Sequence, residues 1–218
     1  MRIVGGEARG RRLKGPKTAG TRPVIDRVKT ALFDILSERV VDAEVLDLFG
    51  GTGAIGLEAL SRGAAHATFV EINHQMAGIL RENARATGLA DRAEVIRGDA
   101  FHFLEMAAVQ GRRYDIVYLA PPQYHQLAAK ALALVERLPL TRPGGLAIVQ
   151  IFPKERVDVD HLPLSKLRQI DERRYGSTLL LFYEDQSPDE SLPQAAGPFE
   201  NTSSDDGAEA AQRPDRSM

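Results

Sequence analysis

Cysteine and tryptophan are both absent from the 218 residues of this chain. Without cysteine, no disulfide and no thiolate metal site can form, which is consistent with the reducing cytoplasm. Without tryptophan, stacking on a nucleic-acid base must use Tyr, Phe or Arg. No apolar run approaches the roughly 20 residues of a membrane span, and the amino-terminus lacks the apolar core of a signal peptide. We expect a cytoplasmic protein with no membrane span and no metal site.

The net charge of −2 hides a strong polarity along the chain. Residues 1–30 carry nine Lys and Arg against two acids, whereas residues 184–218 carry nine acids against two Arg. A basic end is typical of polyanion binding, and an acidic end poor in apolar residues cannot offset the entropy of ordering. We expect a basic RNA-binding arm over 1–22, one folded domain over 23–184, and a disordered acidic tail over 185–218.

The basic arm predicts contacts with phosphates. Residues 1–20 are typical of an extended arm or loose hairpin outside the core, and residues 23–40 have the apolar stripe of a helix. Basic side chains at the start of that helix, Lys29 among them, lie off the stripe and would extend the positive surface. A solvated arm without a partner is the alternative. The predicted phosphate contacts are Arg9, Arg11, Arg12, Lys14, Arg22, Arg27 and Lys29.

From residue 44 onward, short apolar runs alternate with helical patterns. Strands are expected near 44–49, 66–70, 93–97, 114–119 and 146–151, with helices near 54–62, 73–87, 99–109 and 124–138. This alternation predicts an α/β fold with right-handed crossovers and a doubly wound sheet. Two last strands, 166–174 and 177–183, follow with no helix between them and predict an antiparallel pair at the sheet edge.

A glycine-rich turn over residues 45–56 separates the first strand from a helix. Glycines let a ligand approach closely, and a helix start offers free N–H groups. Gly51, Gly53 and Gly56 match the dinucleotide fingerprint. Asp47, a carboxylate inside an apolar strand, suits the cationic methionine end of S-adenosylmethionine better than a pyrophosphate. The turn alone leaves both ligands open.

Acidic residues follow the ends of three successive predicted strands, where open α/β sheets bind ligands. Besides Asp47, these are Glu71, which is placed to accept from ribose hydroxyls, and Asp99, which is placed to accept from an adenine amine while the Ala100 N–H reaches the ring. Each acid could instead cap a helix, and Asp99 is well placed for that role. The predicted cofactor site comprises Asp47, Phe49, Gly50, Gly51, Gly53, Glu71, Ile72, Asp99 and Ala100.

Two prolines, Pro121 and Pro122, follow the fourth predicted strand. They stiffen the backbone and remove two N–H donors, so carbonyls there are available to bind the amino group of a base. Tyr124 is placed to stack on the base, and His125 is expected to be a surface residue rather than a catalytic base. A rigid loop before a helix is the alternative. The predicted catalytic loop comprises Ala120, Pro121, Pro122, Gln123 and Tyr124.

Residues 1–183 resemble the RsmD family, the 16S ribosomal RNA guanine-N2 methyltransferases. The segments that carry the resemblance are 2–6, 10–13, 22–23, 26–33, 46–64 and 175–178. The resemblance implies a Rossmann-like methyltransferase sheet with an antiparallel seventh strand and S-adenosylmethionine as cofactor. It also implies 16S rRNA or the small ribosomal subunit as partner; we expect a monomer.

The loop after the fourth strand departs from the family pattern. The family motif reads Asp-Pro-Pro-Tyr, whereas this chain reads Ala120-Pro121-Pro122-Gln123, with Tyr124 one place late. In such enzymes the Asp carboxylate and the first proline carbonyl would accept from the target amine. Losing one charge-assisted hydrogen bond there costs about 2–3 kcal/mol, roughly two orders of magnitude in rate. Gln123 is placed to offer a neutral amide acceptor, and Gln150, at the end of the fifth predicted strand, is another polar candidate near the site.

Three functions follow. The first is an S-adenosylmethionine-dependent methyltransferase acting on the exocyclic amine of a guanine in 16S rRNA. The second is an RNA-binding or ribosome-assembly protein that keeps the fold with weak or lost catalysis, because position 120 lacks an acceptor. The third is a nicotinamide-dependent oxidoreductase, suggested by the glycine spacing and Glu71.

Overall fold

The computed structural model describes residues 1–15, 26–123 and 126–188, and these all belong to one compact unit, Met1–Pro188. The predictions for Arg22, Tyr124 and His125 lie outside the described residues, as does the predicted tail from residue 189 onward. No helix in the described ranges is long and apolar enough to cross a membrane.

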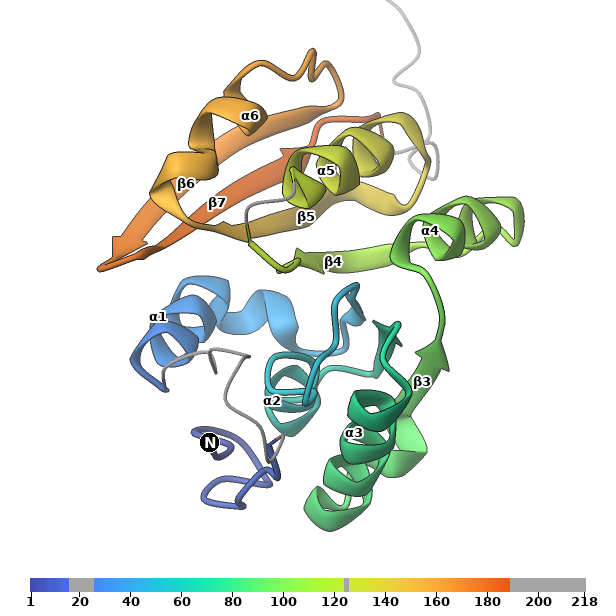
Figure 1. The fold of residues 1–218 in the computed structure, drawn as a ribbon, viewed down its shortest axis with the longest axis vertical. Helices are drawn as coiled ribbons and strands as arrows, with labels where there is room; N and C mark the ends of the chain where they lie inside the picture. The colour runs from blue at the N-terminus through green and yellow to red at the C-terminus, as the bar shows by residue number, and fades with distance from the viewer. Residues whose placement is uncertain (16–25, 124–125, 189–218) are drawn as a thin grey trace, which may run out of the picture. The chain divides into compact units, whose positions relative to one another are not determined.

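A seven-stranded sheet in the order β3-β2-β1-β4-β5-β7-β6 forms the centre of the unit (Figure 1). Its strands are Glu44–Asp47 (β1), His66–Glu71 (β2), Ala93–Arg97 (β3), Tyr114–Leu119 (β4), Thr141–Ile151 (β5), Leu167–Tyr175 (β6) and Thr178–Asp185 (β7). The first five strands are parallel, and β7 runs antiparallel to both of its neighbours. The expected parallel sheet and antiparallel final pair are confirmed, and β7, not β6, pairs with β5.

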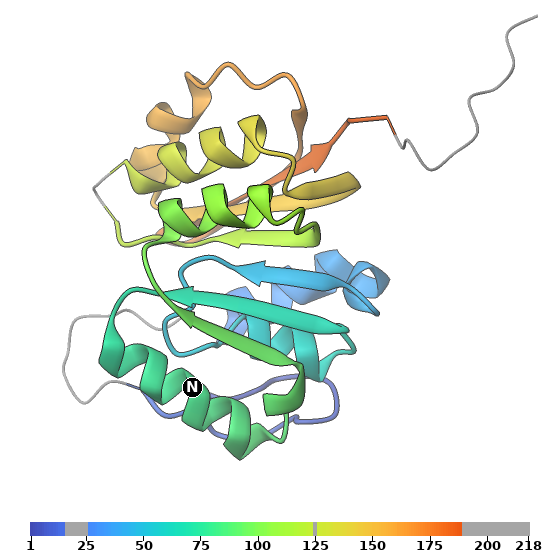
Figure 2. The same cartoon turned by 90° about the vertical axis from the view of Figure 1, so that its right-hand side faces the viewer.

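Helices cover both faces of the sheet (Figures 1 and 2). They are Asp26–Leu36 (α1), Gly56–Ser61 (α2), His74–Thr87 (α3), Ala100–Val109 (α4), Leu127–Arg137 (α5) and Arg156–Asp160 (α6), with 3₁₀ turns at Ser37–Val40 (η1), Ala90–Arg92 (η2) and Pro153–Glu155 (η3). Helices α1 to α3 contribute to one apolar core, and α4 to α6 to the other. Because both faces are covered, the inner strands β1, β2 and β4 are largely buried, whereas the outer strands β3 and β6 are partly exposed.

Helix α3 illustrates how the sequence sets the ends of an element. The side chain of Asn73 accepts hydrogen bonds from the N–H groups of Gln75 and Met76, which satisfies two free donors of the first turn. Gly88 ends the helix with φ 76°, a left-handed conformation that glycine adopts without a side-chain clash. This helix therefore begins and ends within one residue of the predicted 73–87.

The first 15 residues form a hairpin that packs on the side of α2 (Figure 1). An antiparallel bridge joins Arg2 to Arg12, which agrees with the expected loose hairpin. The expectation that this segment stays outside the core is wrong, because Ile3, Ala8 and Leu13 are buried in it. The apolar residues of the hairpin are few, but they recur on one side and cover α2.

Two further expectations fail. Lys29 was expected off the apolar stripe of the first helix, yet its side chain is fully buried together with Phe33 on the inner face of α1. The disordered tail was expected from residue 185, yet Asp185 ends β7, is buried, and accepts from Thr141 and Lys166. Both residues are charged groups whose burial is offset by opposite charge or hydrogen bonds.

Candidate active site

The glycine-rich turn lies at the carboxyl end of β1 and is closed by backbone hydrogen bonds. The Gly50 N–H donates to Val70 O at 2.8 Å, and the Gly53 N–H donates to Gly50 O at 2.7 Å. Gly51 and Gly53 have φ of 52° and 82°, where a side chain would be strained. A Cβ on Gly51 would have its nearest neighbour at 3.8 Å, so this glycine borders open space.

Gly56 serves a different purpose from the other glycines of the turn. A Cβ at this position would lie 2.2 Å from the ring of Phe69 on β2. Glycine therefore allows α2 to start directly against the sheet, and its N–H points at Asp47 Oδ2 over 3.2 Å. The site thus combines close helix–strand packing with an open turn, as the dinucleotide and S-adenosylmethionine hypotheses both require.

Asp47 is the last residue of β1, directly before the glycine-rich turn, and it is 2% exposed. Burial raises the pKa of Asp47 to about 7; the hydrogen bond from Gly56 opposes this rise, and the nearby charge of Glu71 adds to it. Among the described residues, only the Gly56 N–H donates a hydrogen bond to this carboxylate. It would gain most from a ligand that brings a positive charge or strong hydrogen-bond donors.

Glu71 ends β2 and binds the glycine-rich turn. Its Oε2 accepts from the Gly51 N–H at 2.9 Å, and its Oε1 accepts from the Asn73 N–H at 2.8 Å. The half-buried carboxylate is therefore held in place at the rim of the site. Each of its oxygens retains a second lone pair, so it can still accept from a ligand.

Asp99 follows β3 and caps helix α4. Its Oδ1 accepts from the N–H groups of Phe101 and His102, both at 2.9 Å. The helix-cap role considered for Asp99 is therefore present. A ligand role for its other oxygen is compatible with the cap and stays a prediction. Ala100, predicted beside it, is buried at the start of α4.

Apolar and aromatic groups flank the three acids. Phe49 and Phe101 meet edge to face with ring centroids 6.4 Å apart, and Lys130 Nζ lies 4.0 Å from the Phe101 ring centroid. Ile72, directly after Glu71, is 69% exposed. These side chains provide flat apolar surface beside carboxylates, a combination that suits a nucleoside.

The carboxyl end of β4 carries the predicted catalytic loop. Ala120 and Pro121 are half-buried, while Pro122 and Gln123 are exposed. Just before them, the Tyr118 hydroxyl donates to Gln150 Oε1 of β5 at 2.5 Å. Burial raises the pKa of Tyr118 well above 10, and the charge of Asp47 adds to the rise. The sheet thus brings this loop beside the end of β1, which the sequence predicted.

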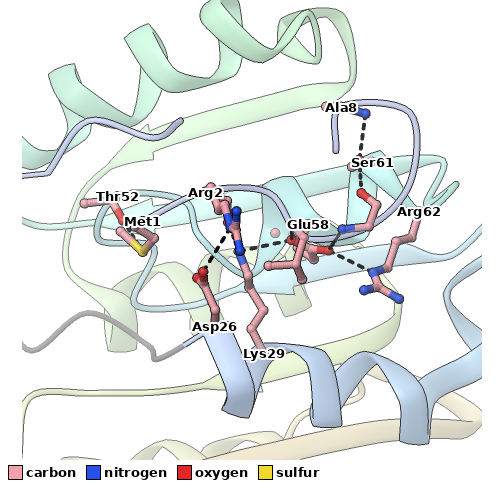
Figure 3. Close-up of polar contacts among 12 residues, drawn as sticks. Met1, Arg2, Ala8, Asp26, Lys29, Thr52, Glu58, Ser61 and Arg62 are labelled. Atoms are coloured by element: carbon pink, nitrogen blue, oxygen red, sulfur yellow. Dashed lines mark hydrogen bonds and ion pairs between the residues drawn. The ribbon is translucent and has the colours of Figure 1, made fainter. Parts of the chain in front are cut away.

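A buried ionic cluster, which the sequence analysis missed, attaches the hairpin to α2 (Figure 3). Glu58 is fully buried and accepts from the Val4 and Gly5 N–H groups at 2.8 and 2.7 Å. It also pairs with Lys29 Nζ at 3.0 Å and Arg62 Nε at 2.9 Å. Every oxygen of Glu58 is therefore bonded twice. The predicted phosphate role of Lys29 is wrong, because its ammonium lies inside this cluster.

Asn83 of α3 ties the other strand of the hairpin to the glycine-rich turn. Its Oδ1 accepts from the Lys14 N–H at 2.8 Å, and its Nδ2 donates to Lys14 O at 3.0 Å and to Thr52 O at 2.9 Å. The amide is fully buried. Both strands of the hairpin are thus attached to elements that border the site. A polar residue on the buried face of a predicted helix was the available signal.

The hairpin holds its basic side chains outward. Arg9, Arg11, Arg12 and Lys14 are all exposed. Lys14 pairs with Glu82 at 2.8 Å, and Arg11 donates to Ala86 O at 2.8 Å, so two of the four reach across α3. Arg27 is exposed on α1. A positive surface therefore lies beside the cluster that borders the site.

A cavity of about 300 Å³ lies at the other end of the strands, away from the glycine-rich turn. It is lined by Asp42, Asp115 and Gly144, among others, near the amino-terminal ends of β1 and β4. Ligands of open α/β sheets bind at the carboxyl ends of strands. We therefore assign the site to the carboxyl ends of β1, β2 and β3, where Asp47, Glu71 and Asp99 lie. Among the described residues, no group of three or more His, Cys, Asp or Glu could hold a metal ion.

Together, the parallel strands, the open glycine turn and the reversed β7 define the Rossmann-like methyltransferase fold. A plain dinucleotide-binding sheet is mostly parallel, so an antiparallel strand inserted between β5 and β6 is a departure from it. A solved RNA methyltransferase chain from Salinibacter ruber, in complex with S-adenosyl-L-homocysteine, shares this fold. Its TM-score is 0.59 at 18% identity, covering 80% of this chain and 98% of that one.

The chain belongs to the RsmD family: the family model described as conserved hypothetical protein 95 matches residues 1–184. Ribosomal RNA small subunit methyltransferase D of Escherichia coli strain K12 is 43% identical over 136 residues, which are 62% of this chain and 67% of that protein. A solved Escherichia coli structure, described as a candidate methyltransferase, has a TM-score of 0.73 at 34% identity and covers 86% of this chain and 99% of that one.

Proposed function

We propose that this protein transfers a methyl group from S-adenosylmethionine to the exocyclic N2 of a guanine in 16S ribosomal RNA. The observation that carries the proposal is the group of acids at three successive strand ends around an open glycine turn. The likeness to a small subunit ribosomal RNA methyltransferase supports the RNA class of the substrate.

Each of the three acids at the strand ends is suited to a different part of S-adenosylmethionine. Asp47 faces the glycine turn, where its carboxylate would compensate the cationic methionine end. Glu71, held by two backbone N–H groups, would accept from the ribose hydroxyls. Asp99 would accept from the adenine amine, with the Ala100 N–H on the ring and Ile72 against its face. An anionic pyrophosphate would meet two carboxylates here, which disfavours the oxidoreductase hypothesis.

Catalysis in this site would be mostly positioning. S-adenosylmethionine, when bound, would supply the methyl group: the amine nitrogen would bond to the methyl carbon as the carbon–sulfur bond breaks. S-adenosylhomocysteine would leave as a neutral thioether, and the amine would release a proton to solvent. The Pro121 carbonyl would accept one amine hydrogen, which turns the nitrogen lone pair toward the methyl group.

The basic hairpin would hold the RNA. Arg9, Arg11, Arg12 and Lys14 face solvent, while Glu58 and Asn83 attach the hairpin to the elements around the site. Phosphate contacts position a nucleic acid without reading its sequence. The target base would be flipped out or already unpaired, because a stacked base cannot reach a site at the sheet edge.

A second candidate function rests on one observation. Ala120 has only a methyl group where an acceptor for the amine is expected, so the chain would bind RNA and assist assembly with little catalysis. Replacing Ala120 with Asp separates the two functions, because a competent site should gain activity from a second acceptor.

The test is transfer of labelled methyl from S-adenosylmethionine to undermethylated small-subunit RNA and to assembled particles. The RNA is then digested, and the labelled nucleoside is identified. We expect N2-methylguanosine from the wild type. No label with either substrate, from a protein that still binds S-adenosylhomocysteine and from Ala120→Asp alike, would favour the binding function.

A further inference from the structure

The end of β5 lies beside the end of β4, with a register that pairs Leu119 with Val149. Continued one residue past the end of β4, this register would place Ala120 beside Gln150. Because side chains alternate across a sheet, Tyr118, Ala120 and Gln150 share the face covered by α1 and α2. On this register, the side chain of Gln150 lies on the same face of the sheet as the methyl group of Ala120.

Gln150 is held by a buried partner. Tyr118 is 1% exposed, and its hydroxyl donates to Gln150 Oε1 at 2.5 Å. Since burial keeps this phenol protonated, it acts as a donor throughout the neutral range. Gln150 itself is half-buried, so part of this side chain stays accessible while Tyr118 holds its amide oxygen.

Methyl transfer to an exocyclic amine calls for two acceptors, one for each N–H. The Pro121 carbonyl is one, and Ala120 supplies none. An amide oxygen has two lone pairs, and Tyr118 uses one of those on Gln150 Oε1. The remaining lone pair is adjacent to position 120, where a second acceptor would be needed.

We infer that Gln150 is a catalytic residue that accepts the second hydrogen of the target amine, and that Tyr118 is its positioning residue. The inference rests on the proposed methyl transfer. It explains how the site functions with alanine at position 120, and it assigns to two neutral side chains a task that a carboxylate could perform.

The test uses the full-length protein and the same methyl-transfer assay. Gln150→Leu should lower kcat by about 10- to 100-fold, the effect of losing one acceptor, while S-adenosylhomocysteine affinity stays within about twofold. Gln150→Glu keeps an acceptor and should retain most activity. Tyr118→Phe should lower kcat less than Gln150→Leu does. Gln169→Leu, on the distant strand β6, is the matched control and should leave kcat unchanged.

The decisive arm is rescue. Adding Ala120→Asp to Gln150→Leu returns an acceptor to the neighbouring strand, so kcat should recover by at least about tenfold. A merely structural role of Gln150 predicts no such recovery. Wild-type kcat in Gln150→Leu, or a loss that Ala120→Asp does not restore, would overturn the inference while methyl transfer by the wild type stands. Absence of transfer by the wild type would overturn the proposed function and this inference together.

Discussion

Two buried carboxylates lie close together along the chain, and they are satisfied in opposite ways. Asp47, at the end of β1, receives one backbone hydrogen bond at 3.2 Å, and burial raises its pKa to about 7. Glu58, in α2, receives two backbone N–H groups and pairs with both Lys29 and Arg62. A buried charge with a complete set of partners maintains structure, whereas one with an incomplete set is available to a ligand.

The two ends of α2 also contact different parts of the protein. The start of the helix borders the glycine-rich turn through Gly56, and its later turn holds the hairpin through Glu58 and Ser61. One short helix therefore joins the proposed cofactor site to the proposed RNA-binding surface. Substitutions on the two sides should change different properties.

The largest effect is expected from Glu58→Gln. This change leaves the buried Lys29 ammonium without an opposite charge at 3.0 Å, and breaking a buried pair in this way costs about 3–5 kcal/mol. Urea unfolding measures the loss. Adding Lys29→Met should recover part of it, and Glu105→Gln, at an exposed position of α4, should change stability by less than about 0.5 kcal/mol. Equal stability of Glu58→Gln and the wild type would contradict a structural role for the Glu58 cluster.

Asp47→Asn should instead stabilise the free protein, increasingly so as pH rises. The folded state holds a proton on Asp47 up to about pH 7, whereas the unfolded chain releases it near the ordinary value of 3.8. Above that value, rising pH therefore favours unfolding of the wild type, by roughly 4 kcal/mol in total once pH exceeds the folded pKa. The advantage of the variant should be large near about pH 8 and less than half as large near about pH 5. A pH-independent difference in urea unfolding would contradict the raised pKa.

Gly56→Ala should destabilise the protein by about 1–3 kcal/mol, because the added Cβ would overlap the Phe69 ring. Gly78, inside α3, is the matched control. A Cβ there has no neighbour within 4 Å, so Gly78→Ala should stabilise the helix by about 0.5–1 kcal/mol. Thermal melts of the two variants should shift in opposite directions, and a shift in the same direction would contradict the packing argument.

The smallest effects are expected on the hairpin surface. Replacing Arg9 and Arg12 with Gln should leave stability unchanged, and it should reduce the dependence of RNA affinity on salt. Two lost phosphate contacts lower the slope of log K against log salt by about 1.4–1.8. The matched control replaces Arg168 and Arg174 of β6, and its slope should equal that of the wild type. Equal slopes for both double variants would place the RNA elsewhere.

Much of the fold could be predicted because the inner parallel strands β1, β2 and β4 are largely apolar on both faces. The strand at residues 114–119 and the helix ends at Asn73 and Gly88 were predicted within a residue or two, since buried runs and caps are local signals. The position of β7 between β5 and β6 is not a local signal, and only the antiparallel pairing of the last two strands was predicted.

The burial of charged residues was the part that could not be predicted. Lys29 lies in a basic segment, and its role depends on an ion pair with Glu58, which is far from it in the sequence. Sparse apolar residues in the hairpin, such as Ile3, become core only because α2 lies beneath them. At the site, the acids at the strand ends were found from topology, whereas the role of Asn83 comes only from tertiary contacts. Gln150 was named from the sequence as a polar candidate, but its partner Tyr118 was not.

We predict that Asp47, which among the described residues accepts only from Gly56, serves the ammonium group at the methionine end of the cofactor, a group that S-adenosylhomocysteine retains. Titration calorimetry of S-adenosylhomocysteine with the wild type and Asp47→Asn tests it most directly, with NADH as the competing ligand. We predict binding by the wild type, at least about tenfold weaker binding by the variant despite its greater stability, and no binding of NADH. Unchanged affinity in Asp47→Asn, or binding of NADH in place of S-adenosylhomocysteine, would contradict the account.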